Sequence, residues 1–168
     1  MDKDHPSAIW RKHRVKIYRT KRNNFYSLAT YQKEHKVKRN SRILIIDDKP
    51  WWSGFSKKVL LEHGYRVDMA RNREEALNKL DSQRYDMVIL DYYFSGTDGV
   101  SSLRQILKRH PEERVVVVSA APSWMEGRDI FRAGAIDYMS KSLDETRLLD
   151  IIQKVLKMKP SPVISRKR

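Results

Sequence analysis

From Arg42 onward, short apolar runs of strand length alternate with longer segments in which apolar residues recur at helical spacing. The apolar runs are continuous, which is typical of parallel strands that are buried on both faces. Five such strands alternate with five helices, so the pattern predicts an α/β fold in which helices cover both faces of one parallel sheet. The expected strands are "RILII", "RVDMA", "DMVIL", "RVVVV" and "AIDYMS".

Turn and capping residues predict where the helices begin and end. Pro50 suits the first turn of a helix that runs through "WWSGFSKKVLLEHG" and is capped at its C-terminus by Gly64. The spacing of an N-terminal capping box occurs at Asn72 with Glu75 and at Ser142 with Glu145. The other two helices are expected near "VSSLRQILKR" and "SWMEGRDIFRAG".

Polar side chains stand where four of the strands end. Asp47 and Asp48 follow the first strand, Asp91 ends the third, Ser119 ends the fourth and Lys141 follows the fifth. Ligands of parallel α/β sheets bind outside the carboxyl ends of the strands, so we expect these side chains to converge on one edge. Neighbouring carboxylates repel and are rarely buried without a compensating cation.

A hard divalent cation explains this set of side chains. Mg²⁺ held by a few carboxylates keeps coordination positions for phosphate oxygens, and a carboxylate can itself be the nucleophile toward a phosphoryl group. The metal ion, the Lys141 ammonium and the Ser119 hydroxyl would neutralise charge on the moving oxygens. The pattern therefore predicts a site where an aspartate becomes phosphorylated.

With these residues in this order, the segment from Arg42 to about Lys159 resembles a response-regulator receiver domain of bacterial two-component systems. The resemblance implies a flavodoxin-like, doubly wound sheet with the strand order 2-1-3-4-5. It also implies Mg²⁺ as cofactor and a sensor histidine kinase or histidine phosphotransferase as partner. The protein would then be a phosphoacceptor in signalling, whose only chemistry is its own phosphorylation and dephosphorylation.

The resemblance implies a role for each matching position. Asp91 corresponds to the phosphoacceptor, and "GTDG" at 96–99 to the turn that follows it. The metal ligands would be Asp47, Asp48, Asp91 and the backbone carbonyl of Tyr93. Phosphate contact and switching would belong to Ser119, Ala120, Tyr138 and Lys141. Three positions depart from the usual pattern: Ser95 and Ser142 replace prolines, and Leu143 replaces an aromatic residue. Without the proline after it, the placement of Lys141 stays open.

Trp51 and Trp52 open the first predicted helix beside the acidic pair, and at most one of them can readily face the core. Receivers are recognised by their partners partly through this helix. Exposed tryptophans are frequent anchors at protein interfaces, so both are candidate docking residues.

The formal net charge of +14 is concentrated at the two ends of the chain. Residues 1–41 contain twelve Lys and Arg against three Asp and Glu, whereas residues 42–159 contain twenty against eighteen. The chain is therefore divided into a basic aromatic arm (1–41), a receiver domain (42–159) and a basic tail (160–168). Such asymmetry favours an acidic partner for the arm.

The sequence leaves the fold and the target of the arm open. "RVKIYRT" and "FYSLATY" fit a hairpin around "KRNN", while a helix from Ser7 fits the spacing almost as well. Basic residues interleaved with aromatic rings are typical of nucleic-acid surfaces. The candidate contacts are Trp10, Arg11, Lys12, Arg14, Lys16, Arg19, Lys21 and Arg22. The alternatives are an arm that packs on the receiver or one that docks an acidic protein.

Two functions stay open at this point. One is a phosphorylation-controlled response regulator whose arm provides the output, and the other is a nucleic-acid-binding or assembly component that uses the receiver fold as a constitutive platform. The chain has no cysteine, no apolar run long enough to span a bilayer and no secretory signal, so we expect a cytoplasmic protein. A homodimer is a further candidate assembly.

Overall fold

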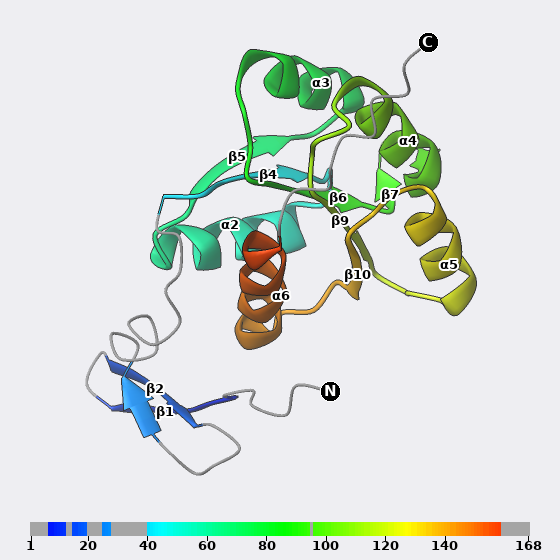
Figure 1. Ribbon diagram of the computed structural model, residues 1–168. Helices are drawn as coiled ribbons and strands as arrows, with labels where there is room; N and C mark the ends of the chain where they lie inside the picture. Colours follow the sequence, from blue (N-terminus) through cyan, green and yellow to red (C-terminus); the bar gives the residue numbers. More distant parts are fainter. Residues whose placement is uncertain (1–6, 13–14, 20–24, 28–39, 95, 159–168) are drawn as a thin grey trace.

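The computed structural model describes residues 7–12, 15–19, 25–27, 40–94 and 96–158. Its largest sheet contains five parallel strands in the order β10-β9-β6-β4-β5, which is the predicted order 2-1-3-4-5 (Figure 1). The bounds of these strands are β4 (Arg42–Ile46), β5 (Arg66–Ala70), β6 (Met87–Asp91), β9 (Val115–Ser119) and β10 (Asp137–Ser140).

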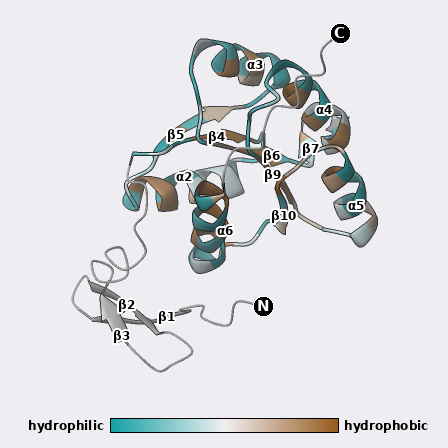
Figure 2. Ribbon diagram, in the orientation of Figure 1, coloured by the Kyte–Doolittle hydropathy of each residue, from teal (hydrophilic) through white to brown (hydrophobic). Residues whose placement is uncertain are grey.

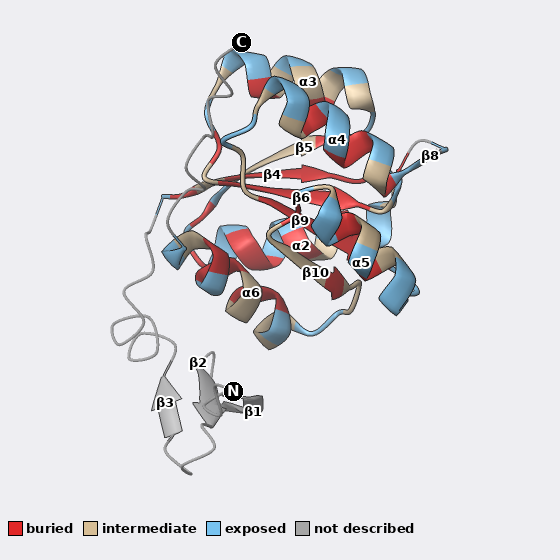
Figure 3. Ribbon diagram, turned by 45° about the vertical axis from the view of Figure 1, so that its right-hand side comes forward, coloured by how far each residue is buried: buried red, intermediate tan, exposed pale blue. Residues whose placement is uncertain are grey.

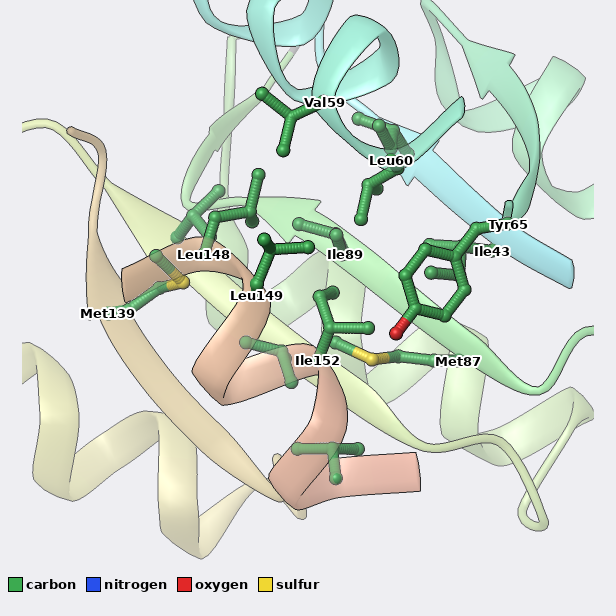
Figure 4. Close-up of a cluster of buried hydrophobic side chains, with 14 of the residues drawn as sticks. Ile43, Val59, Leu60, Tyr65, Met87, Ile89, Met139, Leu148, Leu149 and Ile152 are labelled. Atoms are coloured by element: carbon green, nitrogen blue, oxygen red, sulfur yellow. The ribbon is translucent and has the colours of Figure 1, made fainter. Parts of the chain in front are cut away.

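Five helices cover the two faces of this sheet. Their bounds are α2 (Pro50–Glu62), α3 (Arg73–Ser82), α4 (Gly99–Arg109), α5 (Trp124–Arg132) and α6 (Glu145–Lys157). Helices α2 and α6 pack on one face and α3, α4 and α5 on the other, each with its own hydrophobic cluster. Figure 4 shows the first cluster, in which Leu60 from α2 and Ile152 from α6 meet Ile89 of β6.

The continuous apolar runs become strands because the sheet has a core on both sides. In β4, Ile43 and Ile45 enter the cluster under α2 and α6, while Leu44 and Ile46 enter the opposite cluster. Burying one aliphatic side chain of this size contributes about 1.5–3 kcal/mol, so an inner strand gains from every residue. The inner strands are accordingly hydrophobic in Figure 2 and buried in Figure 3.

The first helix begins and ends as predicted. Pro50 occupies its first turn, where a missing backbone N–H costs nothing. Gly64 follows the helix with a φ of 81°, a left-handed conformation that glycine adopts without steric cost. The helix buries Trp52 completely and leaves Trp51 53% exposed. The expectation that at most one tryptophan faces the core is confirmed, and Trp52 as a docking residue is wrong because its ring is inside the molecule.

The predicted capping boxes are only partly correct. The Asn72 side chain accepts from the Glu75 backbone, but Glu75 in turn accepts from the backbone of Arg71. The predicted box of Ser142 and Glu145 is wrong. Asp144 caps α6 instead, because its side chain accepts from the backbone N–H groups of Thr146 and Arg147. A complete box forms instead at α5, between Ser123 and Glu126.

Smaller strands lie outside the large sheet. β7 (Tyr93–Phe94) and β8 (Thr97–Asp98) pair as a short antiparallel ladder directly after β6, where only a polar loop was expected. In the arm, β2 (Val15–Arg19) pairs with β3 (Phe25–Ser27), in agreement with the hairpin. β1 (Ser7–Lys12) pairs with the other edge of β2, so the alternative of a helix from Ser7 is wrong. Across the part of the chain that the structure describes, no helix is long and apolar enough to cross a membrane.

Replacing Trp52 by alanine should lower the free energy of unfolding by about 3–5 kcal/mol, because the fully buried ring leaves a large cavity. Trp51→Ala is the matched control and should change this free energy by less than about 1 kcal/mol, since half of its surface is already in water. Urea unfolding of both variants measures the difference. Equal losses in the two variants would contradict the assignment of Trp51 to the surface.

Candidate phosphoacceptor and metal site

The three predicted carboxylates meet at the carboxyl edge of the sheet. Asp47 and Asp48 follow β4, Asp91 is the last residue of β6, and these two strands are neighbours. One carboxylate oxygen from each residue lies within 4.8 Å of the others. Asp47 and Asp91 are almost completely buried, at 1% and 2% exposure, whereas Asp48 is partly open to solvent. The sheet thus brings together residues that are 44 positions apart.

Lys141 lies between the two buried carboxylates. Its ammonium is 2.8 Å from Asp47 Oδ2 and 2.9 Å from Asp91 Oδ2, and its side chain is only 2% exposed. The backbone N–H of Lys141 donates to the carbonyl of Ser119 over 2.7 Å, which extends the pairing of β10 with β9. This pairing places Lys141 at the acidic edge of the sheet, although no proline follows it.

The Trp52 ring lies against the Lys141 ammonium. The Lys141 ammonium is 5.5 Å from the centre of the Trp52 ring, and the indole N–H donates to the carbonyl of Ser142 over 3.3 Å. A cation over an indole face is stabilised by the ring quadrupole, more so where water is excluded. Trp52 therefore belongs to the support of the site, a role that its position in the sequence does not indicate.

Backbone groups fix the orientation of the buried carboxylates. The N–H of Lys49 donates to Asp47 Oδ1 over 2.7 Å, and the N–H of Tyr93 donates to Asp91 Oδ1 over 3.2 Å. On the solvent side, the Lys49 ammonium pairs with Asp48 and lies 3.3 Å from the carbonyl oxygen of Tyr93. The carbonyl of Tyr93 therefore faces the acidic site, as expected for a metal ligand.

Opposing influences act on the ionisation of Asp91. Burial raises the pKa of its carboxyl above the usual value, and the charge of Asp47 raises this pKa further. The Lys141 ammonium and the Tyr93 N–H act in the other direction and lower it. Burial is the largest effect, so the pKa stays raised and the ionised carboxylate is poorly solvated.

The predicted switch residues lie beside this site. Ser119 is fully buried at the end of β9, and Ala120 after it is exposed. The Tyr138 hydroxyl donates to Glu126 Oε2 over 2.6 Å, and its pKa is raised to about 12 by burial and by the Glu126 carboxylate. Tyr93 donates its hydroxyl to the other oxygen of Glu126 over 3.1 Å.

Glu126 thus joins Tyr93 to Tyr138, the predicted aromatic switch residue, and Glu126 itself was not among the predicted site residues. Its capping-box spacing after Ser123 was the available signal in the sequence. Tyr138 packs closely against α5 at Gly127, the residue after Glu126. A Cβ at Gly127 would lie 3.1 Å from the Tyr138 ring, so a glycine suits this position.

The donor set fits a divalent hard cation. It consists of three carboxylates and one backbone carbonyl, all oxygen ligands of the kind that Mg²⁺ prefers. The buried carboxylates carry more negative charge than Lys141 alone can balance. The acidic edge therefore has both the ligands and the charge for such an ion.

The predicted residues of the arm are only partly placed. Trp10, Arg11 and Lys12 lie in β1, and Lys16 and Arg19 lie in β2, with Arg11 paired opposite Lys16. Arg14, Lys21 and Arg22 lie outside the described residues. The backbone pairing therefore brings basic positions of two strands next to each other.

Known proteins are similar to this chain in sequence and in fold. The profile of the response regulator receiver domain family matches residues 43–153. The chain is 32% identical over 116 residues to the nitrogen assimilation regulatory protein NtrX of Azorhizobium caulinodans, across 68% of this chain and 26% of NtrX. The chemotaxis protein CheY of Thermotoga maritima is 28% identical over 117 residues, which are 69% of this chain and 98% of CheY.

Among solved structures, a response regulator from Thermotoga maritima matches with a TM-score of 0.66 at 26% identity, over 71% of this chain and 99% of that one. Fold and sequence match together are those of a receiver module of two-component response regulators. The chain belongs to the response regulator receiver domain family. The match spans about a quarter of the length of NtrX.

Proposed function

We propose that this protein accepts a phosphoryl group on Asp91 and thereby relays a two-component signal. The observation that carries the proposal is the position of the Asp91 carboxylate, which ends an inner strand, faces the Lys141 ammonium at 2.9 Å and lies next to two further carboxylates. An aspartate in a purely structural role would gain nothing from two acidic neighbours, because like charges raise the cost of its ionisation.

Asp47, Asp48, Asp91 and the carbonyl of Tyr93 are the residues that would hold Mg²⁺ in this proposal. Bound there, the ion would neutralise charge on the oxygens of the phosphoryl group. Lys141, which pairs with the Asp91 carboxylate in the unphosphorylated site, would contact an oxygen of the phosphoryl group. The Ser119 hydroxyl, at the end of the neighbouring strand, would contact the phosphoryl group.

The chemical step is a phosphoryl transfer to a carboxylate oxygen. One Asp91 oxygen forms a bond to phosphorus while the bond between phosphorus and the leaving atom of the donor breaks, and the leaving group departs with that electron pair. The nucleophile is the ionised carboxylate, and the Lys141 ammonium favours this form against the effect of burial. The product is an acyl phosphate, which water hydrolyses to restore Asp91.

Phosphorylation would be read out through β9 and β10. A contact between the phosphoryl group and Ser119 would shift the end of β9 together with Ala120. Tyr138 is held on α5 by its hydrogen bond to Glu126, so a shift of β9 competes with that bond. Such differential contacts in two states are what a conformational switch requires.

Acetyl phosphate with Mg²⁺ should phosphorylate the wild-type protein, and Asp91→Asn should abolish the incorporation because the nucleophilic oxygen is lost. Intact-protein mass spectrometry measures the added phosphate, and hydroxylamine sensitivity identifies an acyl phosphate. Asp98→Asn is a matched control, since Asp98 caps α4 at the same end of the sheet. Phosphate on the Asp91→Asn variant would sink the proposal.

Trp51 is the proposed contact for a histidine kinase or histidine phosphotransferase. It lies at the start of α2, next to the acidic edge, and half of its surface is exposed. Trp51→Ala should slow phosphotransfer from the cognate partner by about tenfold, since exposed aromatic anchors often contribute more than 1 kcal/mol to an interface. Phosphorylation by acetyl phosphate is the control and should not change. An unaltered rate from the partner would remove Trp51 from the interface.

A second candidate function, nucleic-acid binding through the arm, rests on the charge of residues 1–41 and on the pairing of β1 with β2. The arm is the proposed output of the receiver, or the functional part of an assembly protein that uses the receiver only as a platform. In either case, the arm, the receiver (42–159) and the tail (160–168) are the proposed units of the chain.

If the arm contacts phosphates, the logarithm of the affinity for duplex DNA should fall with the logarithm of salt with a slope of about −4 to −7, at about −0.9 per phosphate neutralised. Deleting residues 1–41 should remove this binding and leave phosphorylation of Asp91 intact. Fluorescence anisotropy at several salt concentrations measures the slope. Undiminished binding by the deletion variant at physiological salt would assign the arm to protein docking instead.

A further inference from the structure

The Lys49 side chain occupies the solvent side of the acidic site. Its ammonium pairs with Asp48 Oδ1 and lies 3.3 Å from the carbonyl oxygen of Tyr93. These two oxygens belong to the set that would bind a divalent cation. Lys49 therefore occupies part of the coordination sphere with its own positive charge.

The two lysines of the site differ in their surroundings. Lys141 lies on the inner side, between Asp47 and Asp91, where solvent does not reach it. The Lys49 side chain is 45% exposed and reaches Asp48 from the outer side. A metal ion that arrives from solvent meets Lys49 and not Lys141, so Lys49 is the cation that it has to displace.

The total charge also favours an exchange of cations. Three carboxylates against two ammonium groups leave one negative charge in excess at the site. A divalent cation in place of the Lys49 ammonium balances this excess.

We propose that Lys49 is a tethered cation that satisfies the outer metal ligands in the metal-free protein and has to leave them before Mg²⁺ binds. The inference rests on the proposed function of the acidic edge as a metal site. In this proposal, Lys49 sets the Mg²⁺ concentration at which the site becomes occupied. Lys49 also limits the repulsion between the carboxylates as long as no metal is bound.

The departure of Lys49 requires only a movement of its side chain. The Lys49 backbone stays anchored, because its N–H donates to Asp47 Oδ1 and its carbonyl accepts from Ser53 in the first turn of α2. A cavity of about 560 Å³ opens beside the site, lined by Asp48, Ser53, Lys57 and Arg71 among others. The freed side chain has solvent and this cavity to enter, so the exchange costs little conformational energy.

The competition should be moderate in strength. Ion pairs with this degree of exposure contribute little in water, so Lys49 can delay the metal without excluding it. Removing the lysine should have opposite effects on the two states of the protein. The metal-free state loses a stabilising cation, and the metal-bound state loses only a competitor.

The test compares Lys49→Met with wild type by calorimetric titration with Mg²⁺ and by thermal unfolding with and without the metal. Lys49→Met should bind Mg²⁺ about two- to fivefold more tightly, the range expected for an exposed ion pair. Its unfolding temperature should be lower than that of wild type without metal, and the increase on adding Mg²⁺ should be larger. Tighter Mg²⁺ binding together with a lower unfolding temperature without metal distinguishes competition from a merely structural role of Lys49.

Two control variants make the comparison specific. Lys57→Met removes the same charge from the next turn of α2, where Lys57 lines the cavity beside Asp48, and it should leave Mg²⁺ affinity nearly unchanged. Lys49→Arg keeps a cation at the position and should bind Mg²⁺ no more tightly than wild type. If Lys49→Met and Lys57→Met change the affinity equally, only the net charge matters and the proposal is overturned.

Failure of this inference and failure of the proposed function give different results. Equal Mg²⁺ binding by wild type and Lys49→Met, with normal phosphorylation of Asp91, would refute the tethered cation alone. No detectable Mg²⁺ binding by either protein at concentrations of about 10 mM would refute both, because the metal site itself would be absent.

Discussion

The ion pairs of Lys141 with Asp47 and Asp91 are the interaction on which the rest of the site depends. Three charged groups with almost no exposure to water are stable only because their charges compensate one another. Removing the cation would leave two carboxylates buried and unpaired, at a cost of about 3–5 kcal/mol. Burial raises the pKa of the Asp91 carboxyl, and the Lys141 ammonium acts against this effect and favours the ionised form that a nucleophile requires.

Both faces of the sheet contribute to this arrangement. On one side, Trp52 fills the core under α2 and α6 and lies against the Lys141 ammonium. On the other side, Glu126 from α5 accepts hydrogen bonds from Tyr93 and Tyr138, which connects the acidic edge to β10. The proposed change of charge at Asp91 would therefore act on groups that also pack the two helical layers, and a local phosphorylation would reach a distant surface in this way.

Much of the fold follows from the sequence, because its strands are apolar on both faces and end in charged residues. The parallel sheet, the meeting of Asp47, Asp48 and Asp91, and the exposure of only one of Trp51 and Trp52 were predictable in this way. The hydrogen bonds of Glu126 and the position of the Lys49 ammonium were not, since both depend on side-chain contacts between distant segments. The cap of α6 was misplaced by two residues, because Asp144 is the residue that caps the helix and accepts from the backbone N–H groups of Thr146 and Arg147.

A structure of the protein with beryllofluoride and Mg²⁺ tests the central claim most directly, because beryllofluoride mimics a phosphoryl group on a carboxylate. The account predicts beryllium bound to an Asp91 oxygen, with fluorine atoms in contact with Lys141 and Ser119. It also predicts a metal ion coordinated by Asp47, Asp48, Asp91 and the carbonyl of Tyr93. An Asp91 carboxylate that stays paired with Lys141 and binds neither beryllofluoride nor metal at saturating concentrations would contradict it.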